Sequence, residues 1–212
     1  MMHTLSQTAN GDLMLQAREA LKGRWGLAVG ADIIYCVIII AVQSIPKVGG
    51  GIGIIVGAPM LVGISGFFLC LARKQDAQLV QIFDGIKRFW VCLGTYLLVL
   101  IFILLWTLLL IIPGIMAAYS YAMVYFILAE NDSIGPLEAI AKSKEMMLGN
   151  RWKLCCLSLR FWGWMMLCIL TMGIGFLWLF PYMGVAFARF YDDLKPAAAA
   201  IEPAAAGQAV MQ

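Results

Sequence analysis

The stretch LLLIIPGIMAAYSYAMVYFILAEND, residues 108–132, decides the fold because a Pro-Gly pair interrupts a very long apolar run. The uncharged run extends from Val91 to just before Glu130, and as one α-helix it would be roughly 58 Å long at about 1.5 Å per residue. A bilayer core is only about 30 Å thick. Proline is favoured in the first turn of a helix and disfavoured in its interior. We therefore expect the chain to cross a membrane twice here, with a tight hairpin turn at Pro113 and Gly114.

The composition is that of a membrane protein. Hydrophobic residues make up 63% of the chain and charged residues only 13%, whereas a soluble domain has about 25% charged residues. The apolar residues form four blocks, 27–42, 49–72, 91–129 and 154–188. The first two blocks can each form one membrane span and the last two can each form two. The sequence thus predicts an all-α integral membrane protein with six transmembrane helices in three hairpins.

The distribution of basic residues predicts the orientation in the membrane. With three hairpins, thirteen of the fifteen Lys and Arg residues fall on one face, Lys47 falls on the other, and Arg160 lies within a span. Lys and Arg are enriched in cytoplasmic loops, so we expect both termini in the cytoplasm. A single passage through the third block would place Lys87 and Lys142 on opposite sides, so the charges also favour two passages.

A short amphipathic segment precedes each predicted hairpin, at residues 13–25, 79–90 and 137–152. Apolar residues recur in these segments at helical spacing, and each segment contains basic residues and a Trp near the start of the span. We expect three amphipathic helices at the membrane interface, with their apolar faces toward the lipid and the Trp side chains at headgroup depth. The three interfacial anchors are Trp25, Trp90 and Trp152.

The ends of the three hairpins also resemble one another, because FFLCLARKQD, VYFILAEND and VAFARFYDD all pass from aromatic and aliphatic residues to polar ones. This similarity fits either an internal repeat or the shared needs of membrane hairpins. We interpret residues 1–195 as one transmembrane domain with units at about 13–75, 76–133 and 134–194. Residues 196–212 are rich in Ala and Pro, which predicts a disordered tail.

Several of these motifs are similar to one known family. LLIIPGIMAAYSYAMVYFILAENDSIGPLEAIAKSKEMMLGNRWKLCCLSLRFWGW (109–164), TMGIGFLWLFPYM (171–183), FYDDL (190–194) and LKGRWG (21–26) resemble the bacterial integral membrane family called domain of unknown function 975. The likeness covers most of residues 13–194. The resemblance implies a multi-spanning protein of the bacterial cytoplasmic (inner) membrane, and it transfers neither an activity nor a site residue.

Asp32 and Arg160 are the charged residues inside the predicted spans, and charges within a membrane are costly enough to be functional candidates. Asp32 lies seven residues after Trp25 and Arg160 eight after Trp152, so both lie about 10 Å from the predicted cytoplasmic interface. They are candidates for an intramembrane polar pair in a proton-linked or ion-linked site. Alternatively, they form a structural ion pair, or Arg160 extends toward the interface.

The sequence contains no recognisable catalytic, cofactor or metal motif. It has no Ser with a His partner and no phosphate-binding loop, and its six cysteines lie in or beside apolar blocks without metal-ligand spacing. The basic residues are balanced by acids, which argues against nucleic-acid binding. Glycines recur every fourth residue at 26 and 30 and at 49, 53 and 57, which predicts close helix packing there.

Two functional hypotheses fit these observations. The first is a non-enzymatic membrane scaffold or membrane-organising protein, because there are three amphipathic anchors and few polar residues in the spans. The alternative is a small-solute or ion transporter or channel that uses Asp32 and Arg160. The expected partners are membrane lipids and either other membrane proteins or further copies of this chain.

Overall fold

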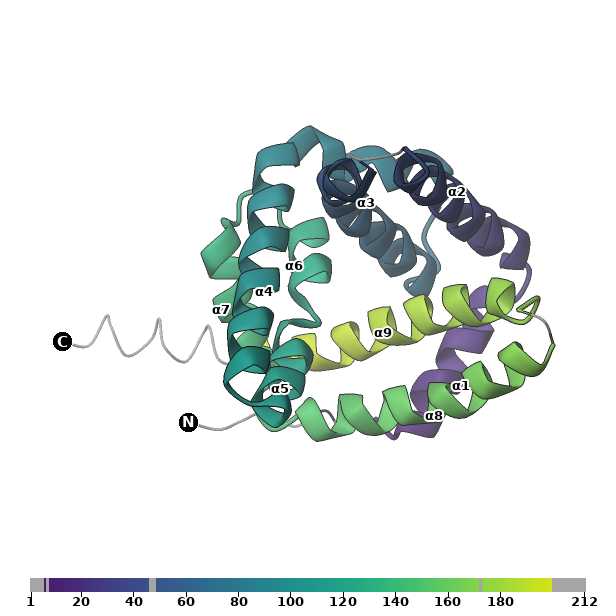
Figure 1. Ribbon diagram of the computed structural model, residues 1–212. Coiled ribbons are helices and arrows are strands. Elements are labelled where there is room, and N and C mark those ends of the chain that lie inside the picture. The colour runs from purple at the N-terminus through teal and green to yellow at the C-terminus, as the bar shows by residue number, and fades with distance from the viewer. Residues whose placement is uncertain (1–5, 7, 46–48, 172, 200–212) are drawn as a thin grey trace.

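The computed structural model describes residues 6, 8–45, 49–171 and 173–199, and the ordered elements in these ranges are helices (Figure 1). In chain order they are α1 (Asn10–Leu21), α2 (Trp25–Gln43), α3 (Gly49–Ala72), the 3₁₀ helix η1 (Leu79–Arg88), α4 (Phe89–Leu109), α5 (Ile111–Tyr121), α6 (Val124–Glu130), α7 (Pro136–Met146), α8 (Arg151–Leu170) and α9 (Phe176–Ala199). The predicted all-α class is confirmed for the described part of the chain.

Five helical segments are long and apolar enough to cross a membrane: Trp25–Gln43, Gly51–Ala72, Leu79–Leu109, Ile111–Glu130 and Arg151–Leu170. They indicate a membrane protein. Helix α9, the sixth predicted span, is not among these five segments, since its second half carries Arg189, Asp192 and Asp193. Six spans arranged as three hairpins therefore stay a prediction.

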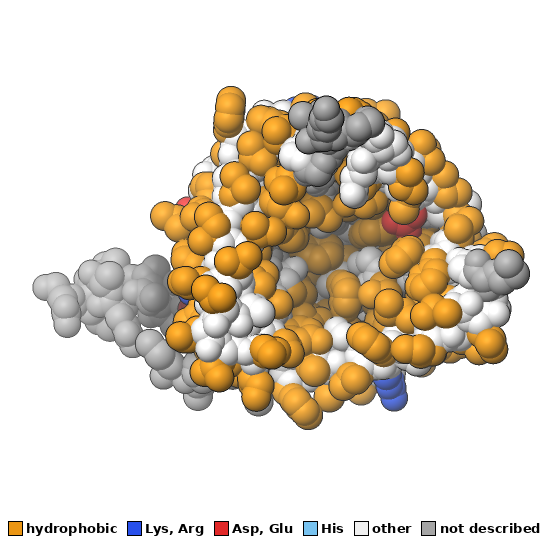
Figure 2. Space-filling model, viewed as in Figure 1, with side chains coloured by type: hydrophobic (Ala, Val, Ile, Leu, Met, Phe, Trp, Pro, Cys, Tyr) orange, Lys and Arg blue, Asp and Glu red, His pale blue; other side chains and the backbone are white. Residues whose placement is uncertain are grey.

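The helices surround a hollow and do not form one parallel bundle. Figure 1 shows α2 and α3 together at the top, α4 along the left side, and α8 and α9 across the lower half. Figure 2 shows that hydrophobic side chains cover most of this face and line the hollow. Helices that follow one another are in contact in the pairs α2–α3, α4–α5 and α8–α9. A surface of this composition suits a lipid environment.

The core lies where α9 passes α1, α3 and α8. Phe67 of α3, Phe161 of α8 and Phe190 of α9 are among the largest side chains that are fully buried. The rings of Phe161 and Tyr182 meet edge to face, 5.5 Å apart. The Tyr182 hydroxyl donates a hydrogen bond of 3.1 Å to the carbonyl oxygen of Met14, which ties α9 to α1. Helix α9 is therefore the central packing element.

The three segments predicted at the interface are helical, but α1 and α7 bury their apolar faces against protein and not against lipid. Leu13, Ala17 and Leu21 of α1 are buried, and α1 packs mainly on α9. Ile140 and Met146 of α7 are buried where α7 meets α4, α5 and α6. This differs from the expected orientation because burial against neighbouring helices competes with burial in lipid. Some apolar side chains do point outward, among them Leu15, Val80, Ile86 and Leu137.

The segment at 79–88 is a 3₁₀ helix that lies antiparallel against α3. A Cβ atom on Gly63 would lie 1.9 Å from the carbonyl oxygen of Ile82, and one on Gly85 would lie 1.9 Å from that of Pro59. Residue numbers therefore rise along η1 as they fall along α3. The two backbones touch, so glycine is required at both positions.

The chain reverses between α4 and α5 at Leu110, whose backbone is extended, with φ −162° and ψ 136°. Pro113 lies in the first turn of α5, where its missing N–H costs little. A Cβ on Gly114 would lie 2.3 Å from Oγ1 of Thr107, so glycine allows α5 to approach α4 closely.

Other predictions on the chain ends and the glycines have mixed outcomes. Residues 196–199, the beginning of the predicted tail, continue α9, and residues 200–212 lie outside the described residues. A Cβ on Gly26 or Gly30 would meet no atom within 4 Å, so the close packing predicted at these two glycines is absent. At Gly53 and Gly57 a Cβ would be in ordinary contact with α2, 3.5 Å from Cγ of Gln43 and 3.7 Å from Cδ1 of Ile39, so α3 does pack against α2 there.

Candidate functional site at the converging helix ends

The ends of α3 and α6 meet the C-terminal half of α9 in one polar cluster. Arg73 directly follows α3, and its Nη2 lies 2.6 Å from Oδ1 of Asp192 and 2.8 Å from Oε1 of Glu130. Its Nε also donates to both carboxylate oxygens of Asp192, at 3.1 and 3.2 Å. Charge-assisted, two-point contacts of this kind are the stronger class of hydrogen bond. The hydrogen bonds that Arg73 donates to Asp192 and Glu130 raise its pKa despite its partial burial, so it stays charged.

Two further residues of α9 complete the exit cluster, which we define as Arg73, Glu130, Tyr191, Asp192 and Lys195. The Tyr191 hydroxyl donates to Oε2 of Glu130 at 2.8 Å, and Nζ of Lys195 contacts Oε1. The Tyr191 ring stacks on Phe126 with 5.7 Å between centroids. Burial, followed by the hydrogen bond to Glu130, raises the pKa of Tyr191. Glu130 thus accepts hydrogen bonds from three donors, one after α3 and two on α9.

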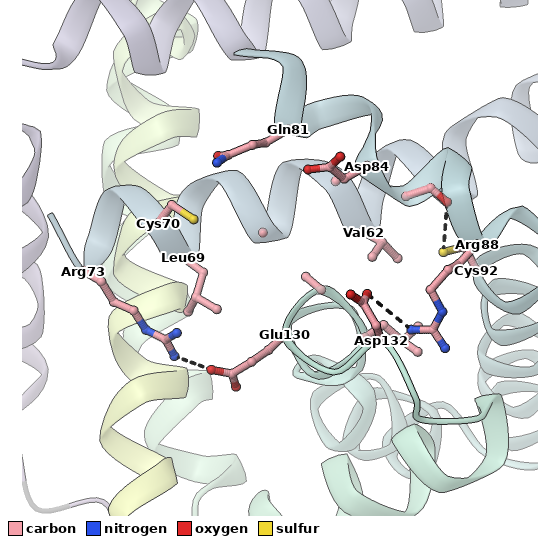
Figure 3. Close-up of a pocket in the computed structure, with 15 residues that line it drawn as sticks. Val62, Leu69, Cys70, Arg73, Gln81, Asp84, Arg88, Cys92, Glu130 and Asp132 are labelled. Carbon is pink, nitrogen blue, oxygen red and sulfur yellow. Dashed lines mark hydrogen bonds and ion pairs between the residues drawn. The ribbon is translucent and has the colours of Figure 1, made fainter. Parts of the chain in front are cut away.

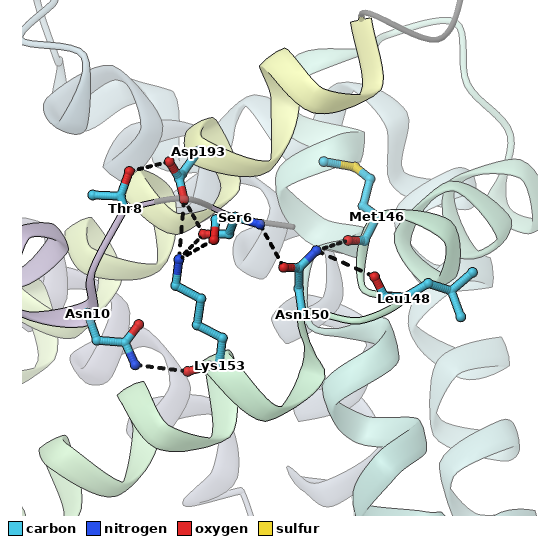
Figure 4. A network of polar contacts seen from close by, with 8 residues as sticks. All are labelled: Ser6, Thr8, Asn10, Met146, Leu148, Asn150, Lys153 and Asp193. Atoms are coloured by element: carbon cyan, nitrogen blue, oxygen red, sulfur yellow. Dashed lines mark hydrogen bonds and ion pairs between the residues drawn. The ribbon is translucent and has the colours of Figure 1, made fainter. Parts of the chain in front are cut away.

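A second network fixes the N-terminal segment to the start of α8 and the end of α9 (Figure 4). Asp193 accepts hydrogen bonds from the hydroxyl groups of Ser6 and Thr8, and its Oδ2 lies 3.7 Å from Nζ of Lys153. The backbone N–H of Ser6 donates to Oδ1 of Asn150 at 2.9 Å. Burial raises the pKa of Asp193, but the hydrogen bonds from Ser6 and Thr8 and the charge of Lys153 outweigh it, so the pKa is lowered overall.

A cavity of about 300 Å³ adjoins the exit cluster and is bounded by α3, η1, the start of α4 and the end of α6 (Figure 3). Arg73 and Glu130 line one side of it, and Arg88 and Asp132 line another. Nη1 of Arg88 lies 3.9 Å from Oδ1 of Asp132. The cavity therefore places charges of both signs next to apolar helix surfaces.

The structure does not join Asp32 and Arg160 in an ion pair among the described residues. Asp32 is partly buried on α2, and its Oδ2 is a buried oxygen without a hydrogen-bond partner in this part of the chain. Arg160 is exposed, and its Nη1 lies 3.5 Å from the place that a Cβ on Gly11 would take. Arg160 thus extends toward the start of α1, as the alternative interpretation of its flexible side chain allows.

The three Trp residues predicted as anchors have different environments. Trp90 is 81% exposed and Trp152 is 75% exposed, so both can reach lipid headgroups. Trp25 is partly buried and packs against the core. Sequence spacing placed all three at the start of a span but could not show that the neighbours of Trp25 would cover it.

The exit cluster is the feature that sequence reasoning missed. The similarity of the three hairpin ends was visible in the sequence, yet Arg73 and Asp192 lie 119 positions apart and nothing in one sequence pairs them. The described residues contain no group of three or more His, Cys, Asp or Glu that could hold a metal ion. All six cysteines are free thiols. The site offers charge pairing and hydrogen bonding.

These features define a protein of membrane-protein type that is all-helical over the residues the structure describes, with ion pairs that join the ends of α3 and α6 to α9. The family model described as "Protein of unknown function (DUF975)" matches residues 107–198, which confirms the resemblance over this segment. The match includes Glu130, Tyr191, Asp192 and Asp193, whereas Arg73 and Asp32 lie outside it. Comparison with curated proteins and with solved structures found no match.

Proposed function

We propose that the protein is a non-enzymatic scaffold of the bacterial inner membrane, with both termini in the cytoplasm. The observation that carries this proposal is the exit cluster, because one guanidinium joins the ends of α3 and α6 to the C-terminal half of α9, and these three helices are distant in sequence. A cluster of this kind resists separation of the helices, since breaking one ion pair leaves the remaining charges partly buried without an opposite charge. The result is a stiff platform at one side of the helices.

The outward apolar side chains of α1, η1 and α7 give this platform a means of acting on a bilayer. Val80 is 70% exposed, Leu137 is 65% exposed and Leu15 is 59% exposed. Apolar side chains on interfacial helices insert between headgroups, and the binding strength grows with the apolar area that enters the lipid. A stiff platform with several such insertions bends the bilayer or presents a fixed surface to a partner protein.

Reconstitution tests this proposal. The full-length protein is placed in liposomes at rising protein-to-lipid ratios, and vesicle diameter is measured by cryo-electron microscopy, while partners are captured from native membranes in mild detergent. Wild-type protein should reduce vesicle diameter or retain a specific membrane partner. A variant with Val80→Ser and Leu137→Ser should do so less, and Lys22→Gln, an exposed polar control, should behave as wild type. Unchanged vesicles together with an empty capture would contradict the scaffold role.

A transporter role is the second candidate, and the buried, unpartnered Oδ2 of Asp32 favours it. An unpaired carboxylate oxygen within a candidate span is costly unless it binds a proton or a solute. Against this role, neither of the cavities of about 300 and 290 Å³ is lined by Asp32. Replacing Asp32 by Asn together with Arg160 by Gln should abolish uptake if this role is correct. Unchanged uptake in cells with a known phenotype would exclude it.

A further inference from the structure

The cavity beside the exit cluster combines apolar walls with a charged rim. Its apolar surface comes from α3 and α6, and its rim comes from η1, the start of α4 and the residues after α6 (Figure 3). Apolar lining residues include Val62, Leu69 and Leu128, and charged ones include Asp84, Arg88 and Asp132. Cavities of about 300–1,000 Å³ with a few convergent polar groups are typical of small-molecule sites. This cavity, at about 300 Å³, has room for a small polar group.

The charges in the cavity favour a ligand that carries a positive group. Three carboxylates, those of Asp84, Glu130 and Asp132, and two guanidiniums, those of Arg73 and Arg88, line it, so its formal charge is two minus three, or −1. An inorganic anion would be repelled by this excess of negative charge. An ammonium group would be attracted, because opposite charges within a few ångströms stabilise each other.

Two of the carboxylates, Asp84 and Asp132, are less fully paired than the guanidiniums, whereas Glu130 contacts Arg73, Tyr191 and Lys195. Arg88 donates to the carbonyl oxygens of Asn131 and Ile134 at 2.8 and 2.7 Å. Asp132 is 96% exposed and lies 3.9 Å from Arg88, its nearest ion-pair partner in the described chain. Asp84 pairs at 2.8 Å with Lys87, whose side chain is 79% exposed, and exposed pairs of this kind contribute little. Asp84 and Asp132 are therefore available to accept hydrogen bonds from an ammonium.

Arg88 also supplies a place for an anionic group on the same ligand. A guanidinium has five N–H donors, and the two carbonyl contacts of Arg88 leave others for a phosphate. The apolar helices α3 and α6 border the cavity, so an attached apolar chain would stay in contact with apolar surface. We propose that this cavity binds a headgroup that carries a primary ammonium and a phosphate, as phosphatidylethanolamine does. This proposal does not depend on the scaffold role.

Native mass spectrometry of the full-length protein tests the proposal. The protein in mild detergent is mixed with equal amounts of phosphatidylethanolamine, phosphatidylglycerol and phosphatidylcholine, and the bound lipids are counted. The ethanolamine lipid should be enriched about threefold or more over the other two, because phosphatidylglycerol lacks the ammonium and phosphatidylcholine lacks N–H donors. The double variant with Asp84→Asn and Asp132→Asn should lose this enrichment.

A matched control distinguishes loss of the cavity carboxylates from a general effect of the change in net charge. Asp12→Asn with Glu138→Gln makes the same change in net charge at exposed positions outside the cavity, and it should keep the enrichment. Soluble glycerophosphoethanolamine distinguishes the source of the headgroup: displacement of the bound lipid shows that the headgroup suffices, and retention shows that the chains contribute. Equal binding of phosphatidylglycerol, or enrichment that survives in the double variant, would overturn the proposal.

Discussion

Replacing Gly63 by Ala should destabilise the protein strongly because Gly63 lies where α3 touches η1. The added Cβ would lie 1.9 Å from the carbonyl oxygen of Ile82 and 2.5 Å from its carbonyl carbon, whereas ordinary contacts begin at 3.4 Å. The two helices would have to separate by about 1.5 Å, the difference between 3.4 and 1.9 Å. The obstacle is backbone, which cannot rotate away as a side chain can.

The size of the effect follows from the cost of overpacking. Forcing an extra methyl group into a packed core costs roughly 1–3 kcal/mol, and a clash with backbone belongs at the upper end. For a chain of this size, about 3 kcal/mol lowers the melting temperature by roughly 6–12 °C. Gly30→Ala is the matched control, since a Cβ there meets nothing within 4 Å and alanine in a helix is favoured by up to about 1 kcal/mol.

Thermal unfolding of both variants in the same detergent, followed by tryptophan fluorescence, measures these effects. The expected order of melting temperature is Gly30→Ala at or above wild type, and Gly63→Ala well below both. A Gly63→Ala variant that melts within a degree of wild type would show that α3 and η1 are not in backbone contact.

Two further predictions concern the N-terminal network and the Trp anchors. Asp193→Asn should lower the melting temperature by roughly 3–6 °C at pH 7. The folded-state pKa of Asp193 is below its ordinary value of 3.8, so the ionised carboxylate stabilises the folded protein above that pH. In thermal unfolding, the difference in melting temperature between wild type and variant should therefore shrink as the pH falls below 3.8. A difference that grows on acidification would contradict this sign. In variants that keep one Trp each, brominated lipids should quench the fluorescence of Trp90 and Trp152 more than that of Trp25, because Trp25 packs against the core. Equal quenching of all three Trp residues would argue against the packing of Trp25.

The sequence alone predicted the features that depend on one short stretch of the chain. The length of the apolar run and the rule for proline predicted a reversal near Pro113, and the structure ends α4 at Leu109 and begins α5 at Ile111. Helical spacing predicted helices before each hairpin. These inferences need only the thickness of a bilayer and the geometry of one helix.

The sequence was less informative where distant segments meet. Glycine spacing indicated close packing at Gly26 and Gly30, yet the backbones touch at Gly63 and Gly85, because spacing shows that a helix can be approached but not which helix approaches it. The same limit hid the contact of Arg73 with Asp192 and the covering of Trp25. Composition marked Asp32 and Arg160 as unusual, but their separation depends on how α1, α2 and α8 are placed.

The central claim is that the polar segments between the helices lie on one side of the membrane. Labelling these segments with a membrane-impermeant thiol reagent tests this claim most directly. Single cysteines replace Lys22, Asp76 and Asp132, all exposed, one at a time in a variant without the six native cysteines. We expect none of the three to be labelled in intact cells and all three to be labelled once the inner membrane is opened. Labelling of any one of them from outside, with the others protected, would contradict it.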